Sequence, residues 1–163
     1  MRLIACAARP LPAGDLPTCS ADSGRTGRAV VPVVDASVAL KWFVEEPDSP
    51  AAHHLLEAHA TGESTLVAPD LLIYEVSNVL LHHPTFRAAD VQRSIERLYE
   101  LDVELIAPSV ELISATISLA AAKRLTFYDA LYVQLAHHLE LPLYTADRKL
   151  IAKLHGLPLI RSL

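Results

Sequence analysis

The sequence is poor in cysteine, and the position of its two cysteines limits the chemistry open to it. Among the 163 residues only Cys6 and Cys19 are cysteines, and both lie within the first 29 residues. Residues 30–163 therefore offer no disulfide, no thiolate nucleophile and no cysteine-based zinc site. A chain of this kind needs no oxidising compartment, and we expect it in the cytoplasm.

Long apolar runs are also absent, although 52% of the residues are hydrophobic and the mean hydropathy is +0.29. No stretch approaches the roughly 20 apolar residues that a helix needs to cross a bilayer. We therefore expect a soluble globular protein with no membrane partner. A length of 163 residues is most simply one domain, since domains commonly run about 100 to 150 residues.

Basic residues are scarce once the first 29 residues are set aside. Residues 30–163 hold ten Lys and Arg against seventeen Asp and Glu, a formal charge of −7. This balance excludes a broad basic face of the kind that neutralises nucleic-acid phosphates. If RNA or DNA is the substrate, bound cations or a local basic rim must mediate the contact.

Residues 1–29 differ in composition from the rest of the chain. They are rich in proline and glycine, contain four arginines and show no sustained helix or strand period. This composition predicts a disordered N-terminal extension, or a start codon assigned too early. A short apolar patch after Arg2 resembles a secretory signal, but it is shorter than the usual apolar region of about 7 to 15 residues. We expect the folded domain to comprise residues 30–163.

From residue 30 onward, strand-like and helix-like segments alternate. Strands are expected at 31–35, 65–69, 103–108, 142–147 and 157–161, and helices at 36–44, 50–60, 70–83, 88–101, 110–123, 128–140 and 148–155. Strands separated by helices predict right-handed βαβ units. The expected fold class is α/β, with a mostly parallel central sheet of about four or five strands and helices on both faces. Ligands of such sheets lie beyond the carboxyl ends of the strands.

Three aspartates stand at strand ends or helix starts. Asp35 ends the first expected strand, Asp147 ends the fourth, and Asp129 follows Thr126 at the spacing of a capping box. Each therefore has a plain structural interpretation as a helix cap. Helix N-termini also favour the ionised carboxylate, so capping and ligand binding are compatible.

Glu75 lies in an expected helix that is apolar almost all round, which indicates a buried element. At about 100° per residue, Glu75, Asn78 and His82 share one narrow stripe of that helix. The stripe is either a solvent-facing edge or the polar wall of a cavity.

The four acids together suggest more than any one alone. Asp35, Glu75, Asp129 and Asp147 can converge at the carboxyl edge of a parallel sheet. Each ionised pair about 5 Å apart would cost roughly 3 kcal/mol at an effective dielectric near 20, and a divalent cation would remove that cost. Oxygen ligands without cysteine indicate a hard cation, Mg²⁺ or Mn²⁺. Metal-assisted phosphodiester hydrolysis is the chemistry that such a site favours.

Other candidate sites are less well supported. Adjacent histidines on a helix point about 100° apart and no HExxH spacing occurs, so solvated surface is favoured over zinc for the pairs His53-His54, His82-His83 and His137-His138. A phosphatase of the haloacid-dehalogenase type would need a second aspartate where Ser37 stands. We expect Trp42 and Phe43 to form packing or dimer contacts.

Several cations near two of the acids have two interpretations. They are either ordinary surface charge near helix ends or a basic rim facing RNA, and they are Lys123, Arg124, Arg148, Lys149 and Lys153.

Four segments carry a resemblance to a known family. VVDASVALKWF, VAPDLLIYEVSNVLL, LTFYDALYVQLA and PLYTADRKL, in this order, resemble the motifs of PIN-domain ribonucleases, specifically the VapC-type toxins of type II toxin–antitoxin systems. The resemblance covers residues 31–160, nearly the whole expected domain. The tail at 1–29 has no counterpart in the family pattern, and the loop HHPTF has few of the basic residues often found there.

The resemblance implies roles for individual residues. Asp35, Glu75, Asp129 and Asp147 would form the acidic catalytic quartet of a hydrolase that depends on Mg²⁺ or Mn²⁺. Asp35 and Asp129 would hold the metal most directly, with Glu75 and Asp147 binding it directly or through water, and either one acting as the base. Ser37, Asn78 and Thr145 would orient these carboxylates or bind substrate oxygens.

The resemblance also implies a substrate and partners. The substrate would be RNA, cleaved to leave 3′-hydroxyl and 5′-phosphate ends. The family forms homodimers and is inhibited by a cognate antitoxin, in a hetero-oligomer, whose C-terminal segment crosses the active site. The alternative is a catalytically weak PIN-like module that binds RNA or protein.

Overall fold

A computed structural model describes residues 31–163 of the chain. The predicted extension at 1–29, with Cys6 and Cys19 and the patch that resembles a signal, lies outside the described residues. Among residues 31–163, no helix has both the length and the apolar character needed to span a membrane.

The centre of the fold is a sheet of five parallel strands, as predicted. Their order is β3-β2-β1-β4-β5, and the strands are β1 (Val33–Val34), β2 (Val67–Pro69), β3 (Glu104–Ile106), β4 (Leu143–Thr145) and β5 (Ile160–Ser162). Val33 of β1 pairs with Val67 on one side and with Leu143 on the other. Because the central strand β1 ends at Val34, Asp35 emerges in the middle of the carboxyl edge.

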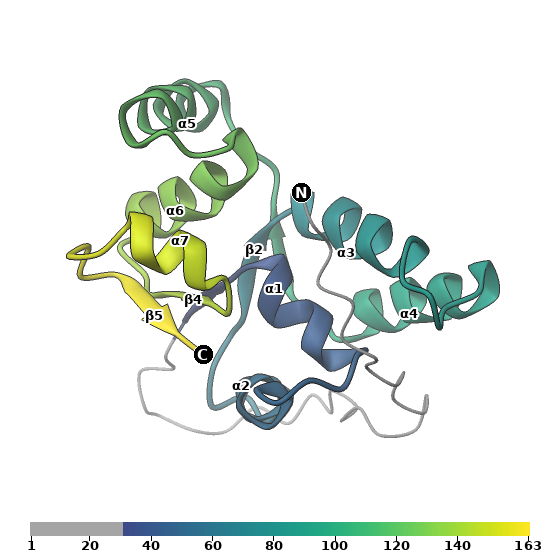
Figure 1. Ribbon diagram of the computed structural model, residues 1–163. Helices are drawn as coiled ribbons and strands as arrows, with labels where there is room; N and C mark the ends of the chain where they lie inside the picture. Colours follow the sequence, from purple (N-terminus) through teal and green to yellow (C-terminus); the bar gives the residue numbers. More distant parts are fainter. Residues whose placement is uncertain (1–30) are drawn as a thin grey trace.

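Helices connect the strands and cover both faces of the sheet (Figure 1). They are α1 (Ala36–Ala39), the 3₁₀ turn η1 (Leu40–Trp42), α2 (Ser49–Ala60), α3 (Leu71–Leu81), α4 (Ala88–Glu100), α5 (Val110–Lys123), α6 (Phe127–Leu139) and α7 (Arg148–Lys153). Helix α6 packs against β1, β2 and β4, and α5 packs on the outside of α6. Helix α3 packs against β2 and α1, so α3 and α6 approach the centre of the sheet from different directions.

The segment expected as one helix at 36–44 is shorter and divided. Helix α1 tightens into the 3₁₀ turn η1, which ends at Trp42. Trp42 is fully buried and its indole Nε1 donates to the carbonyl oxygen of Ala52 at 3.1 Å, while Phe43 is 5% exposed. The expectation that both aromatic side chains serve packing is therefore confirmed.

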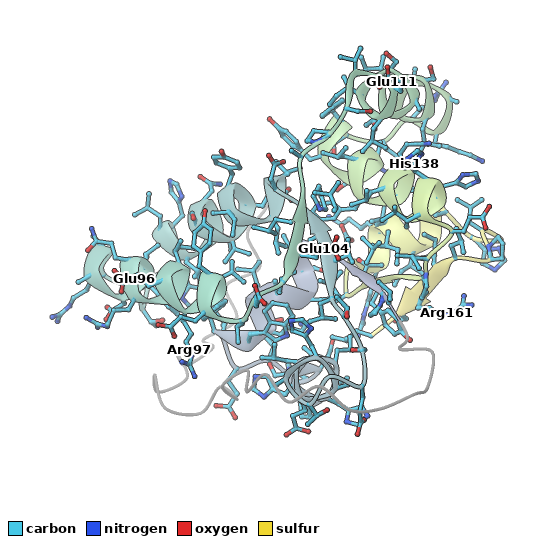
Figure 2. The ribbon with its side chains drawn as sticks, turned by 180° about the vertical axis from the view of Figure 1, so that it is seen from behind. Glu96, Arg97, Glu104, Glu111, His138 and Arg161 are labelled. Atoms are coloured by element: carbon cyan, nitrogen blue, oxygen red, sulfur yellow. The ribbon has the colours of Figure 1, made fainter. Side chains whose placement is uncertain are left out.

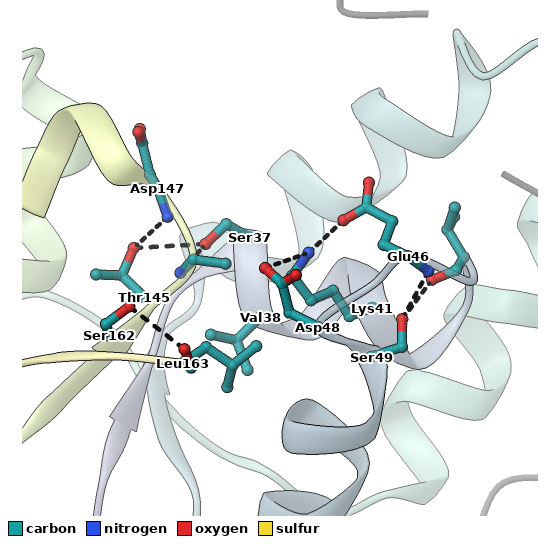
Figure 3. A network of polar contacts seen from close by, with 12 residues as sticks. Ser37, Val38, Lys41, Glu46, Asp48, Ser49, Thr145, Asp147, Ser162 and Leu163 are labelled. Atoms are coloured by element: carbon teal, nitrogen blue, oxygen red, sulfur yellow. Dashed lines mark hydrogen bonds and ion pairs between the residues drawn. The ribbon is translucent and has the colours of Figure 1, made fainter. Parts of the chain in front are cut away.

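Next to Trp42, Lys41 is buried and forms an ion pair with Glu46, and its Nζ lies 3.7 Å from the carboxylate of Asp48 (Figure 3). Asp48 is the residue before α2, and its side chain makes no capping hydrogen bond there.

Candidate functional site

Asp35 caps α1 and at the same time presents a carboxylate at the centre of the sheet edge. Its Oδ1 accepts hydrogen bonds from the backbone N–H groups of Ser37 at 2.9 Å and Val38 at 3.2 Å, and from the Ser37 hydroxyl at 2.5 Å. All three bonds end on the same oxygen. The cap interpretation is thus confirmed, and it leaves Oδ2 outside these three bonds.

The environment of Asp35 disfavours its charge. The side chain is 6% exposed, and burial raises the pKa of its carboxyl above the ordinary value. Hydrogen bonds from Ser37, Thr145 and Val38 oppose that rise. A buried carboxylate held this way gains from a nearby cation.

Hydroxyl groups connect the ends of β1 and β4 (Figure 3). The Ser37 hydroxyl accepts from the backbone N–H of Ala146 at 2.8 Å, and its oxygen lies 3.4 Å from that of Thr145. The Thr145 hydroxyl, which is fully buried, accepts from the backbone N–H of Asp147 at 3.0 Å. Ser37 and Thr145 therefore fix the position of Asp147 relative to Asp35.

Asp147 caps α7 in the same manner as Asp35 caps α1. Its Oδ1 accepts from the backbone N–H groups of Lys149 at 2.7 Å and Leu150 at 3.3 Å. Both bonds again use one oxygen. The other oxygen of Asp147 takes no part in the cap.

Asp129 lies in the first turn of α6. Its backbone N–H donates to the Thr126 hydroxyl at 3.0 Å, so Thr126 is the N-cap. This is the predicted cap with only one of the two bonds of a full capping box. Within residues 31–163 the Asp129 carboxylate has no hydrogen-bond or ion-pair partner, which makes it the acid with the fewest local constraints.

Glu75 is half-buried on α3 and is held by a residue that the sequence analysis missed. The hydroxyl of Tyr132 on α6 donates to Oε2 of Glu75 at 2.7 Å. Tyr132 is 2% exposed and stands three residues after Asp129, on the same side of α6. The sequence does contain a signal for this contact, a tyrosine on a buried helix face, because a buried tyrosine hydroxyl requires a polar partner.

Three of the four acids share one electrostatic environment. Burial raises the pKa of Glu75 above the ordinary value; the Tyr132 hydrogen bond lowers it, and the charges of Asp35 and Asp129 raise it further. The pKa of Tyr132 is also raised, by burial and by the same three carboxylates. Asp35 follows β1, and Glu75 and Asp129 lie on α3 and α6, so the fold brings acids from three distant segments within electrostatic range of Glu75 and Tyr132.

Asn78, which the resemblance predicts to orient a carboxylate or bind substrate, lies on the exposed side of α3. Leu72, Val76 and Leu80 are fully buried on α3, whereas Asn78 is exposed one turn after Glu75. The Asn78 side chain makes no hydrogen bond within the described part of the chain, and its carbonyl oxygen lies 2.7 Å from Nδ1 of His82.

The chemistry of these side chains suits a hard cation. Asp35, Glu75, Asp129 and Asp147 offer carboxylate oxygens, and burial disfavours the ionised forms of Asp35 and Glu75. Across residues 31–163, no three His, Cys, Asp or Glu side chains stand close enough to be grouped as ligands of one ion.

Comparisons with known proteins place the chain in a family. The family model described as PIN domain matches residues 33–160. The chain is 33% identical over 129 residues to Ribonuclease VapC3 from Pyrobaculum aerophilum, covering 77% of this chain and 95% of the relative.

Two solved structures share the fold of this chain. The crystal structure of PAE2754 from Pyrobaculum aerophilum is similar with a TM-score of 0.60 and 27% identity, over 83% of this chain and 90% of the other. A toxin–antitoxin complex from Klebsiella pneumoniae has a TM-score of 0.56 over 79% of this chain and 94% of the other, and at 17% identity it supports the fold alone. On the family match, the similarity to a VapC ribonuclease and the shared architecture, this chain belongs to the PIN-domain family.

Proposed function

We propose that the protein is a metal-dependent endoribonuclease of the VapC type, which hydrolyses RNA phosphodiester bonds as the toxin of a type II toxin–antitoxin pair. The observation that carries this proposal is the electrostatic coupling of Asp35, Glu75 and Asp129 at the carboxyl edge of the sheet. The similarity to Ribonuclease VapC3 over most of the chain supports RNA as the substrate.

Residue roles follow from how each acid is held. Asp35 and Asp129 would hold Mg²⁺ or Mn²⁺, and the bound ion would neutralise the carboxylates, polarise the phosphodiester and lower the pKa of a bound water. Glu75 or Asp147 would accept a proton from the attacking water. The raised pKa of Glu75, caused mainly by burial, favours it as the base.

The nuclease proposal is tested by RNA cleavage with and without divalent metal. Mg²⁺ or Mn²⁺ should support cleavage, EDTA should abolish it, and Asp35→Asn or Asp129→Asn should abolish it with the fold intact. Asp102→Asn is the matched control, because Asp102 is exposed in a left-handed turn (φ 55°) that Asn also adopts readily. Cleavage that persists in EDTA and in both site variants would leave a PIN-like binding module as the function.

The toxin role adds protein partners. We propose a cytoplasmic homodimer that a cognate antitoxin inhibits by covering the carboxylates. Induction in bacteria should arrest growth, and co-expression of the neighbouring small reading frame should relieve the arrest. Arrest by Asp129→Asn equal to that by the unmodified protein would contradict a nuclease toxin.

The domain boundary is part of the same proposal. The described sheet, helices and carboxylate site all lie within residues 31–163. Deletion of residues 1–29 should therefore leave the melting temperature and cleavage rate unchanged. Insoluble protein after this deletion would show that the extension contributes to folding.

A further inference from the structure

Half of the basic residues in the acidic domain gather beside two of its catalytic acids. Residues 30–163 contain ten Lys and Arg. Five are exposed on the end of α5, the turn that follows it and α7, and we call them the basic rim: Lys123, Arg124, Arg148, Lys149 and Lys153. None of the five forms an ion pair with a carboxylate among the described residues.

The rim is continuous in space although it comes from two segments. The Nζ of Lys153 donates to the carbonyl oxygen of Arg124 at 3.5 Å, which joins the last turn of α7 to the start of the turn between α5 and α6. Arg124 stands five residues before Asp129, and Arg148 directly follows Asp147. Arg124 and Arg148 are thus close in sequence to the acids at the starts of α6 and α7, and Lys153 joins the two segments.

Three of the five Lys and Arg residues outside the rim form ion pairs with carboxylates, namely Lys41, Arg93 and Arg97. Arg93 pairs with Asp90 and Arg97 with Glu100, both on α4. Arg161 on β5 donates to backbone carbonyl oxygens of its own segment, at 2.5 and 3.0 Å. Figure 2 shows Arg97 and Arg161 well apart, on α4 and β5. Among the described residues no carboxylate neutralises a rim cation in this way, which leaves their charge available to an external anion.

An exposed aromatic ring accompanies the rim. Tyr128 is 56% exposed in the first turn of α6, between Arg124 and Asp129 in sequence. Proteins hold single-stranded nucleic acid with two elements. Cations bind along the phosphate backbone, and aromatic side chains stack on the bases.

We propose that the basic rim binds the sugar–phosphate backbone of single-stranded RNA while Tyr128 stacks on a base, which brings a phosphodiester to the carboxylates. This inference rests on the proposed ribonuclease function. It addresses a problem posed by the charge of residues 30–163, because a segment of net charge −7 repels a polyanion and a local basic rim offers it a favourable point of approach.

The test measures RNA binding without cleavage. A fluorescein-labelled single-stranded RNA of about 12 nucleotides is titrated in EDTA, and fluorescence anisotropy gives the affinity from about 50 to 200 mM KCl. The variant is Lys123→Gln/Arg124→Gly/Lys153→Gln. Arg124 has φ 52°, a left-handed conformation that glycine adopts without strain, so this change removes charge without destabilising the fold.

The salt dependence identifies the contacts. On a single strand each lost phosphate contact lowers the slope of log affinity against log salt by about 0.7, so the triple variant should lose about 2 in slope and bind roughly 10-fold more weakly at low salt. Tyr128→Ala should weaken binding with an unchanged slope, because stacking releases no counterions. An unchanged slope in the triple variant, or an unchanged affinity in Tyr128→Ala, would overturn the corresponding part of the proposal.

Two controls separate the rim from general charge and backbone effects. Glu140→Gly changes a second left-handed helix end (φ 56°), and Arg87→Gln/Arg161→Gln removes two cations outside the rim. Both should retain the affinity, and an equal loss in either would contradict the rim. Duplex RNA that binds as tightly as the single strand would contradict single-strand recognition.

The outcome also separates this inference from the nuclease proposal. Binding in EDTA needs neither metal nor catalysis. A protein that never cleaves but binds RNA through the rim would retain this inference and lose the nuclease proposal. A protein that cleaves with no dependence on the rim would do the opposite.

Discussion

Asp35 and Asp147 stand at the ends of the neighbouring strands β1 and β4, and each accepts hydrogen bonds from backbone N–H groups of the helix that it caps. We call these two acids the strand half of the site. Glu75 and Asp129, which we call the helix half, lie on α3 and α6 without such bonds to their carboxylates. In the strand half, the ordinary geometry of helix N-termini fixes one oxygen of each acid. In the helix half, the Tyr132 hydroxyl alone holds Glu75. The two halves should therefore respond differently to substitution.

The largest effect should come from Asp35→Asn in the strand half. Asparagine caps helices about as well as aspartate, so the fold should persist. Loss of the charged oxygen should lower kcat on the order of 1,000-fold, within the range for removing a principal catalytic group. Steady-state cleavage of a labelled RNA with parallel thermal melts checks both statements. A melting temperature that collapses together with activity would show that Asp35 acts mainly in the fold.

The next effect concerns Tyr132, which positions Glu75 in the helix half. Tyr132→Phe removes one hydroxyl and should lower kcat by about 10- to 100-fold, as loss of a supporting hydrogen bond at a metal site commonly does. KM should change little, and stability should fall by about 1 kcal/mol. Tyr144→Phe on β4 is the control. A fall in stability with full kcat would limit Tyr132 to packing.

The helix caps of the site are the part that sequence reasoning could predict, and the physical reason is that capping bonds are local. Asp35, Thr126 and Asp147 each cap a helix through bonds that span two or three residues, and residue type and spacing indicate such bonds directly. The bond from Tyr132 to Glu75 spans 57 positions and exists only because α3 and α6 pack on the same sheet. The order of the strands depends on tertiary packing in the same way.

Ser37 tests whether the two acids of the strand half act as one unit. Ser37→Ala keeps both backbone bonds to Asp35 but removes the hydroxyl that bonds Asp35 and Ala146. We expect about a 10-fold loss of kcat from misplacement of Asp147, and a loss of about 1 kcal/mol in stability. Ser37→Thr restores a hydroxyl and should recover most of the rate. No recovery in Ser37→Thr would indicate that space, and not the hydrogen bond, is limiting at this position.

The smallest effect is the pH dependence of stability in metal-free protein. The folded-state pKa values of Asp35 and Glu75 are raised, mainly by burial. The folded state therefore holds protons that the unfolded chain has released. Stability from these groups is complete below their ordinary values of 3.8 and 4.5, and it is lost as pH rises through the folded values.

Thermal melts from about pH 4 to pH 8 in EDTA compare the unmodified protein with Asp35→Asn. The variant should melt at nearly the same temperature at the acid end and a few degrees higher near neutrality, since 1 kcal/mol corresponds to about 2–4 °C in a domain of this size. Mg²⁺ should remove that difference by stabilising the ionised carboxylates of the unmodified protein alone. Because Asp102→Asn changes an exposed carboxylate, its melting curve should follow the unmodified protein at every pH. A constant offset between Asp35→Asn and the unmodified protein across the whole range would mean that burial of Asp35 does not oppose its charge.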